Sequence, residues 1–304
     1  MNVRRSNQER LSERGVSFSR FSDIMEKKAR RGGVAMFYNA KNGCVRIGTE
    51  EMDYIVFGRG KRTLIMLPGI GDGLKTARGM AIPFALMYRK FAKDFRVYVF
   101  SRRRNLPQGY TTREMARDQI EAMDVLGIKR ADMVGVSMGG MIAQWMAIDA
   151  PERMGNLALV VTASRMNEIL RDSLDAWMRY TDHNDHFGLM MDSMRRMYTQ
   201  KYLDKNRWLL PLTAGIGKPK SYERFRIMAE ACAEHNAYGK LEEIKARTLI
   251  VGGGKDKALG ILASREMAEK ISDVRMKVYE EYGHALYEEA KGFNAVLLRF
   301  LLEK

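Results

Sequence analysis

The sequence predicts an α/β protein with a mostly parallel central sheet, helices on both faces and a helical cap insertion. Two observations carry this prediction. Short strands alternate with helices from about residue 44 to residue 161, and several strands are continuous apolar runs, as at residues 157–161. Only a strand that is buried on both faces can dispense with polar alternation. The alternation then stops and resumes at residue 248, which indicates an insertion between two stretches of one sheet.

The first half of the chain supplies most of the predicted sheet. Apolar, β-branched runs bounded by turn residues predict strands at 44–48, 53–57, 63–67, 97–100, 133–136 and 157–161. Helical periodicity predicts helices at 80–95, 112–126 and 138–149. The helix at 138–149 is almost wholly apolar, so we expect it to be central.

The second half begins with the insertion. Residues 165–243 are rich in Met, Arg and Tyr and predict helices only, which form a cap over the carboxyl edge of the sheet, where ligands of open α/β folds bind. The core then resumes with strands at 248–251 and 275–279 and helices at 263–271 and 293–302. The predicted units are a basic N-terminal extension (1–34), a core (35–164 and 244–304) and a cap (165–243).

Composition excludes several classes of protein. With 46% hydrophobic and 29% charged residues, the 304-residue chain is typical of a globular protein. Cys44 and Cys232 are too few and too far apart for a disulfide framework or a zinc site. No apolar run reaches 18 residues and none follows the polar start, so we expect no integral membrane segment, no secretory signal and a cytoplasmic location.

The net charge of +15 raises the question of a polyanionic partner. The charge is spread, with no block of five like charges and no zinc-finger or RNA-binding signature, so we expect a small-molecule substrate and no nucleic-acid partner. The extension has a weak apolar face, which leaves three docking partners open: the body of the protein, a second subunit in a homodimer, and an anionic membrane. Docking on the body is the simplest.

A G-x-S-x-G motif at residues 135–139 carries the chemistry, with Ser137 at its centre. It joins an apolar strand to an apolar helix, where a sharp, strained turn lifts the serine hydroxyl above the sheet. The start of the helix offers free N–H groups to a developing negative charge. The absence of G-x-x-x-x-G-K-[ST] counts against the competing interpretation, a phosphate-binding loop. Ser137 is therefore the predicted nucleophile.

A serine nucleophile needs a base and an orienting carboxylate. Of the four histidines, only His284 lies outside the insertion, in the loop after the last predicted strand. Asp256 follows the strand at 248–251 in a glycine-rich loop. Loops after parallel strands open at one edge of the sheet, so we expect Ser137, Asp256 and His284 to meet there.

Here the chain resembles the α/β-hydrolase superfamily, specifically its small capped serine hydrolases. The resemblance rests on Leu67-Pro68-Gly69-Ile70, on residues 135–140, on Lys255-Asp256 and on Gly283-His284. It implies that Ser137 is the nucleophile, Asp256 the acid and His284 the base. It also implies that the amides of Ile70 and Met138 form the oxyanion hole, with Gly69 and Gly71 bordering the substrate. Many relatives have His-Gly at Pro68-Gly69, so the shape of this loop stays open.

The resemblance implies hydrolysis of a carboxylic ester of a small, largely apolar substrate through an acyl-enzyme, with no metal and no cofactor. A C–C bond hydrolase, an acyltransferase and a non-enzymatic small-molecule receptor stay open. His183 and His186 favour a polar helix end over a metal site, and Arg102-Arg103-Arg104 favour surface charge over a carboxylate-binding site. Some of the seven methionines in the insertion are expected to line an apolar pocket.

Overall fold

The computed structural model describes residues 37–303, so the predicted extension (1–34) lies outside the described residues. One eight-stranded sheet has the order β1-β2-β4-β3-β5-β6-β7-β8. The first two strands run antiparallel to their neighbours, and β4, β3, β5, β6, β7 and β8 pair in parallel. The strands are β1 (Lys41–Ile47), β2 (Glu50–Phe57), β3 (Arg62–Leu67), β4 (Phe95–Arg103), β5 (Ala131–Val136), β6 (Met154–Val160), β7 (Thr248–Gly253) and β8 (Val274–Tyr279). The predicted fold class is confirmed.

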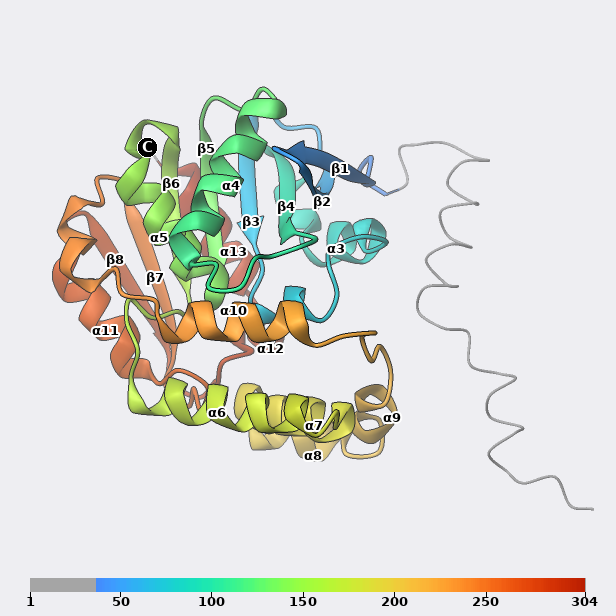
Figure 1. Cartoon of the computed structure of the whole chain (residues 1–304). Coiled ribbons are helices and arrows are strands. Elements are labelled where there is room, and N and C mark those ends of the chain that lie inside the picture. Colours follow the sequence, from blue (N-terminus) through green and yellow to red (C-terminus); the bar gives the residue numbers. More distant parts are fainter. Residues whose placement is uncertain (1–36, 304) are drawn as a thin grey trace, which may run out of the picture.

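Helices cover both faces of the sheet (Figure 1). One apolar cluster lies between the sheet and α4, α5 and α11, and a second lies between the opposite face and α3 and α13. Ile65 of β3 belongs to the first cluster, whereas its neighbours Leu64 and Met66 belong to the second. This explains why the strand has no polar alternation. The helices of the core are α3 (Ala81–Met87), α4 (Thr112–Val125), α5 (Met138–Asp149), α11 (Ile261–Lys270), α12 (Leu286–Glu289) and α13 (Phe293–Leu302).

The prediction of one helix over residues 80–95 is wrong. The helix α3 ends at Met87, a short 3-10 turn follows at Arg89–Phe91, and β4 already begins at Phe95. Phe95 is fully buried and pairs with Arg62 of β3. The chain must therefore leave the helix early to enter the sheet, and this tertiary requirement overrides the local helical pattern.

Between β6 and β7 the chain forms only helices, apart from one isolated bridge between Arg165 and Asn236. Three of these helices begin at residues whose side chains accept a hydrogen bond from a first-turn amide, namely Asn167, Asp185 and Thr199. Figure 1 shows α10 between the sheet and the outer helices α6 and α7. The helices are α6 (Glu168–Asp182), α7 (His186–Met197), α8 (Gln200–Asn206), α9 (Leu210–Ala214), α10 (Glu223–Ala233) and the 3-10 helix η4 (Tyr238–Glu243). None of the helices within residues 37–303 combines the length and apolarity needed to cross a bilayer.

Candidate active site

Ser137 occupies the sharp turn between β5 and α5. Its φ of 54° and ψ of −123° lie outside the regions that non-glycine residues favour. The neighbouring glycines permit close approach of the backbone: a Cβ on Gly139 would lie 2.0 Å from the Leu67 carbonyl oxygen, and one on Gly135 would lie 2.5 Å from the carbonyl oxygen of Gly139. The glycines of the motif thus let α5 pack directly against the sheet, with Ser137 held at its edge.

His284 and Asp256 meet in the loops that follow β8 and β7. The imidazole Nδ1 lies 2.8 Å from Oδ2 of the carboxylate, and both side chains are buried. Asp256 Oδ1 accepts hydrogen bonds from the amides of Ala258 and Leu259 at 2.8 and 3.0 Å. Burial alone would raise the pKa of Asp256, but the charge and hydrogen bonds of His284 and the two amides lower it. An ionised carboxylate only accepts hydrogen bonds, so Nδ1 carries a proton and Nε2 is the ring atom left to act as a base.

Ser137 and His284 line the same cavity of about 390 Å³ beneath the helices between β6 and β7. Gly69, Ile70 and Gly71 also line it, whereas Asp256 lies behind the imidazole and outside the lining. The remaining lining side chains are mostly apolar and come from α3, α6, α7 and α10 as well as the core; they include Leu74, Met80, Phe84, Trp177, Met190, Met197, Phe225 and Tyr287. The cavity therefore joins a serine, an imidazole and an apolar surface.

The loop after β3 lies against Ser137. A Cβ placed on Gly69 would be 3.3 Å from the Ser137 Cβ, tighter than an ordinary contact. Ile70 begins a short 3-10 helix, η1 (Ile70–Gly73), and Met138 begins α5. The amide of a first helical residue has no acceptor within its own helix. The amides of Ile70 and Met138 are thus placed beside Ser137 as candidate donors to an oxyanion.

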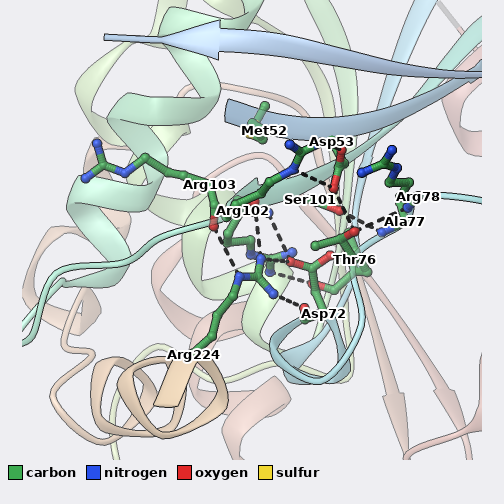
Figure 2. Close-up of polar contacts among 12 residues, drawn as sticks. Met52, Asp53, Asp72, Thr76, Ala77, Arg78, Ser101, Arg102, Arg103 and Arg224 are labelled. Carbon is green, nitrogen blue, oxygen red and sulfur yellow. Dashed lines mark hydrogen bonds and ion pairs between the residues drawn. The ribbon is translucent and has the colours of Figure 1, made fainter. Parts of the chain in front are cut away.

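A buried charge cluster of Asp72, Arg102 and Arg224, which was not predicted from the sequence, contacts this loop (Figure 2). Surface charge is the wrong interpretation for Arg102, whose side chain is fully buried. Its Nη2 donates a hydrogen bond to the Pro68 carbonyl at 2.5 Å, and its backbone amide donates to Asp72 Oδ2 at 3.0 Å. Burial lowers the pKa of Arg102 to about 10, against the opposing effect of Asp72, so the guanidinium stays charged at neutral pH.

Arg224 brings a second guanidinium to the cluster from α10. Its Nη2 donates to Asp72 Oδ2 at 2.6 Å and to the Arg102 carbonyl at 3.2 Å, its Nε donates to the Arg103 carbonyl at 3.1 Å, and its Nη1 donates to the Asp72 carbonyl. Figure 2 shows Arg224 reaching from below toward Asp72 and toward Arg102 and Arg103 at the end of β4. This side chain therefore ties α10 to the loop that carries the Ile70 amide.

Comparison with known proteins identifies the family of the chain. The profile of the alpha/beta hydrolase fold family matches residues 62–291. The chain belongs to this family.

Relatives of this α/β hydrolase include a lactonase and a dienoate hydrolase. A 3-oxoadipate enol-lactonase of Acinetobacter baylyi is 25% identical over 82% of this chain and 94% of its own. A 2-hydroxy-6-oxo-6-phenylhexa-2,4-dienoate hydrolase of Comamonas testosteroni is 28% identical over 60% of this chain and 66% of its own. The crystal structure of the enol-lactonase from Burkholderia xenovorans LB400 superposes with a TM-score of 0.72 at 22% identity, covering 86% of this chain and all of the other, and shows a shared fold. Family and relatives together indicate a hydrolase.

The other histidines of this α/β hydrolase serve different local roles. Nδ1 of the exposed His183 contacts the Arg179 carbonyl at 2.8 Å, and Nε2 of His186 lies 3.3 Å from the Ile216 carbonyl. The ring of His235 is buried and contacts Thr112. Across residues 37–303, His, Cys, Asp and Glu side chains form no group of three or more that could hold a metal ion. Nothing in the described residues favours the metal site considered for His183 and His186.

Proposed function

We propose that this α/β hydrolase is a serine hydrolase that cleaves a carboxylic ester of a small, largely apolar substrate. The observation that carries the proposal is the arrangement of three side chains. Ser137 lies at a strained turn and lines the same cavity as His284. Nδ1 of the His284 imidazole is hydrogen-bonded to the buried Asp256. These are the parts of a nucleophile, a base and an orienting carboxylate.

In the proposed reaction, Ser137 Oγ attacks the ester carbonyl and its proton passes to His284 Nε2. The amides of Ile70 and Met138 donate hydrogen bonds to the oxyanion that forms. The imidazolium then gives its proton to the leaving alcohol, which leaves an acyl group on Ser137. His284 takes a proton from a water molecule that attacks this acyl-enzyme, and the carboxylic acid departs. Asp256 stays ionised throughout, because its lowered pKa opposes protonation at neutral pH.

The cavity supports an apolar substrate of modest size. Its volume of about 390 Å³ is near the lower end of the roughly 300–1,000 Å³ of small-molecule sites. Trp177, Met190 and Met197 contribute apolar surface from the cap helices. Methionine adapts to varied apolar partners, so we expect the cavity to accept acyl groups of different shape but similar volume.

A second candidate is hydrolysis of a C–C bond next to a carbonyl. It is favoured by the dienoate hydrolase among the relatives. The same nucleophile, base and oxyanion donors would serve it, so the geometry does not separate the two reactions. Product analysis separates the two reactions. An aryl ester is cleaved at a C–O bond and yields a phenol and a carboxylic acid. A dienone acid is cleaved at a C–C bond, so its two products were linked through carbon in the substrate.

The decisive experiment is labelling with a fluorophosphonate probe, which reacts with activated serines. We expect labelling of the wild type, none of Ser137→Ala, and full labelling of Ser193→Ala. Ser193 is a matched control because it lines the same cavity but donates its hydroxyl to the Leu189 carbonyl. Aryl esters of increasing acyl length, tested on the same three proteins, would then define the substrate. Labelling that survives in Ser137→Ala, or turnover above a tenth of the wild type, would overturn the proposal.

A further inference from the structure

The outer end of the cap exposes large apolar side chains that have no role in the proposed reaction. Trp208 is 71% exposed, and Leu212 and Ile216 are each 64% exposed. All three lie in a continuous segment, residues 200–220, which contains α8, α9 and the loop that follows; we call it the cap tip. Apolar side chains of this size are usually covered by a partner when several gather on one segment.

The cap tip is also strongly basic. It contains one acidic residue, Asp204, against five basic ones, and in the part of the chain that the structure describes none of these five forms an ion pair. The five are Lys201, Lys205, Arg207, Lys218 and Lys220, and all are exposed. Exposed apolar and cationic side chains therefore share one segment, which suits a partner that is both apolar and anionic.

The position of the cap tip relates it to the cavity. Both α8 and α9 contact α7, and Figure 1 shows α9 at the end of the cap, away from the sheet. Met190 and Met197 of α7 line the cavity. The helix α7 thus contacts the cap tip and also contributes to the lining of the cavity.

Charge discriminates between the conceivable occupants. A second copy would bring the same basic surface to this one, and like charges across an interface oppose association. Residues 1–36 contain nine Lys and Arg against four Asp and Glu, so the same argument opposes cover by the N-terminal segment. A nucleic acid would satisfy the cations but would leave Leu212 and Ile216 without an apolar environment. A bilayer with anionic headgroups satisfies both kinds of side chain, because tryptophan and basic residues favour the headgroup region while aliphatic side chains enter the acyl boundary.

We propose that the cap tip binds the surface of a membrane that contains anionic lipids, with Trp208, Leu212 and Ile216 inserted at the headgroup boundary. This binding does not depend on the proposed esterase activity. It predicts that the protein sediments with vesicles of phosphatidylglycerol and phosphatidylcholine in equal parts and much less with phosphatidylcholine alone. Added salt should weaken the binding, since exposed charges are screened.

Intrinsic fluorescence reports the orientation on the vesicle. The three tryptophans are Trp145 and Trp177, which are 8% and 6% exposed, and Trp208, which is 71% exposed. A blue shift of the emission on adding anionic vesicles therefore comes from Trp208 entering an apolar environment. The shift should disappear in Trp208→Phe, while sedimentation of that variant is largely retained.

The variant Leu212→Ser/Ile216→Ser should lower the vesicle partition coefficient at least about tenfold, because each aliphatic side chain adds apolar area to the buried surface. Leu262→Ser is the matched control: Leu262 is 67% exposed but lies on α11, and its partition coefficient should change less than about twofold. The melting temperatures of both variants should stay close to that of the wild type, which would show that they are folded whether or not the protein is an esterase.

Three outcomes would overturn the proposal. The first is no sedimentation with anionic vesicles. The second is sedimentation that Leu212→Ser/Ile216→Ser leaves unchanged, which would assign the binding to another surface, including residues 1–36. The third is a dimer that the same variant converts to a monomer while the wild type ignores vesicles, which would identify a second copy as the occupant.

Discussion

Replacing Arg224 with methionine tests whether the helix α10 positions the loop of Ile70, whose amide is a proposed oxyanion donor. The substitution keeps most of the side-chain volume but removes every hydrogen bond from Arg224 to Asp72, Arg102 and Arg103. Breaking a buried ion pair usually destabilises a protein by about 3–5 kcal/mol. The Asp72 side chain is 1% exposed but that of Arg224 is 15% exposed, so we expect the lower end of this range, about 3 kcal/mol.

The same substitution should affect catalysis separately from stability. Removing one oxyanion donor lowers kcat by about 100- to 1,000-fold in a serine hydrolase. In Arg224→Met the Ile70 amide is still present, but its loop has lost the hydrogen bonds from Arg224 to Asp72. The hydrogen bond from Arg102 to the Pro68 carbonyl remains. We therefore expect kcat to fall about 10- to 100-fold with little change in KM, a loss of transition-state binding alone.

The assay is turnover of a short-chain aryl ester, well below the melting temperature, divided by the active sites titrated with a fluorophosphonate. Arg226→Met is the control, since Arg226 lies on the same helix but pairs with Asp182 at 2.8 Å in an exposed ion pair. Such pairs contribute at most about 1 kcal/mol, and kcat should stay within about twofold. If Arg224→Met loses stability but keeps its kcat per titrated site, or if both variants lose kcat alike, Arg224 is a structural residue only.

Three further predictions follow from single contacts. Asp256→Asn should lower kcat by about three to four orders of magnitude at neutral pH, because an amide does not hold Nδ1 in its protonated form; a loss under tenfold would contradict the proposed orienting role. Burial lowers the pKa of His235 to about 3, so the unfolded state binds a proton below about pH 6.5 that the folded state does not, and stability must fall on acidification. Urea unfolding at pH 7 and pH 5 should show a loss about 1–2 kcal/mol larger for the wild type than for His235→Gln, and equal losses would show that His235 does not control this change. Gly139→Ala places a methyl group 2.0 Å from the Leu67 carbonyl oxygen and should destabilise by about 3 kcal/mol, whereas Gly239→Ala, with nothing within 4 Å of its Cβ, should remain near the wild type; thermal melts compare the two.

The local pattern of the sequence was enough to predict much of the core. The apolar strands and the helix α5 were located because elements that are buried on all sides consist almost entirely of apolar residues. The turn at Ser137 was located because a strained backbone with close neighbours needs glycines at fixed positions. The helix over residues 80–95 was predicted too long, because the entry of Phe95 into the sheet is decided by its pairing with β3 and not by its helical neighbours.

The charge cluster behind the loop of Ile70 could not have been predicted in the same way. Asp72 and Arg224 are 152 residues apart, and nothing beside Arg224 in the sequence distinguishes it from Arg226 two residues later. Arg102 belongs to a run of three arginines, of which only this one is fully buried. The difference arises from what packs against each residue: Arg102 meets the Pro68 carbonyl and Asp72, whereas Arg104 pairs with Asp53 and stays 33% exposed.

The sequence by itself determined the order of strands and helices along the chain, the chemical types of the candidate site residues and the loops on which these residues lie. It could do so because periodicity and turn chemistry act over a few neighbouring residues. The sequence also predicted that the loops of Ser137, Asp256 and His284 meet. Only the tertiary structure decided the hydrogen bond between Asp256 and His284, the apolar cavity that Ser137 and His284 border, and the contact of Arg224 with the loop of Ile70. These contacts depend on how distant elements pack, and the burial that makes a charge pair strong exists only once they have packed.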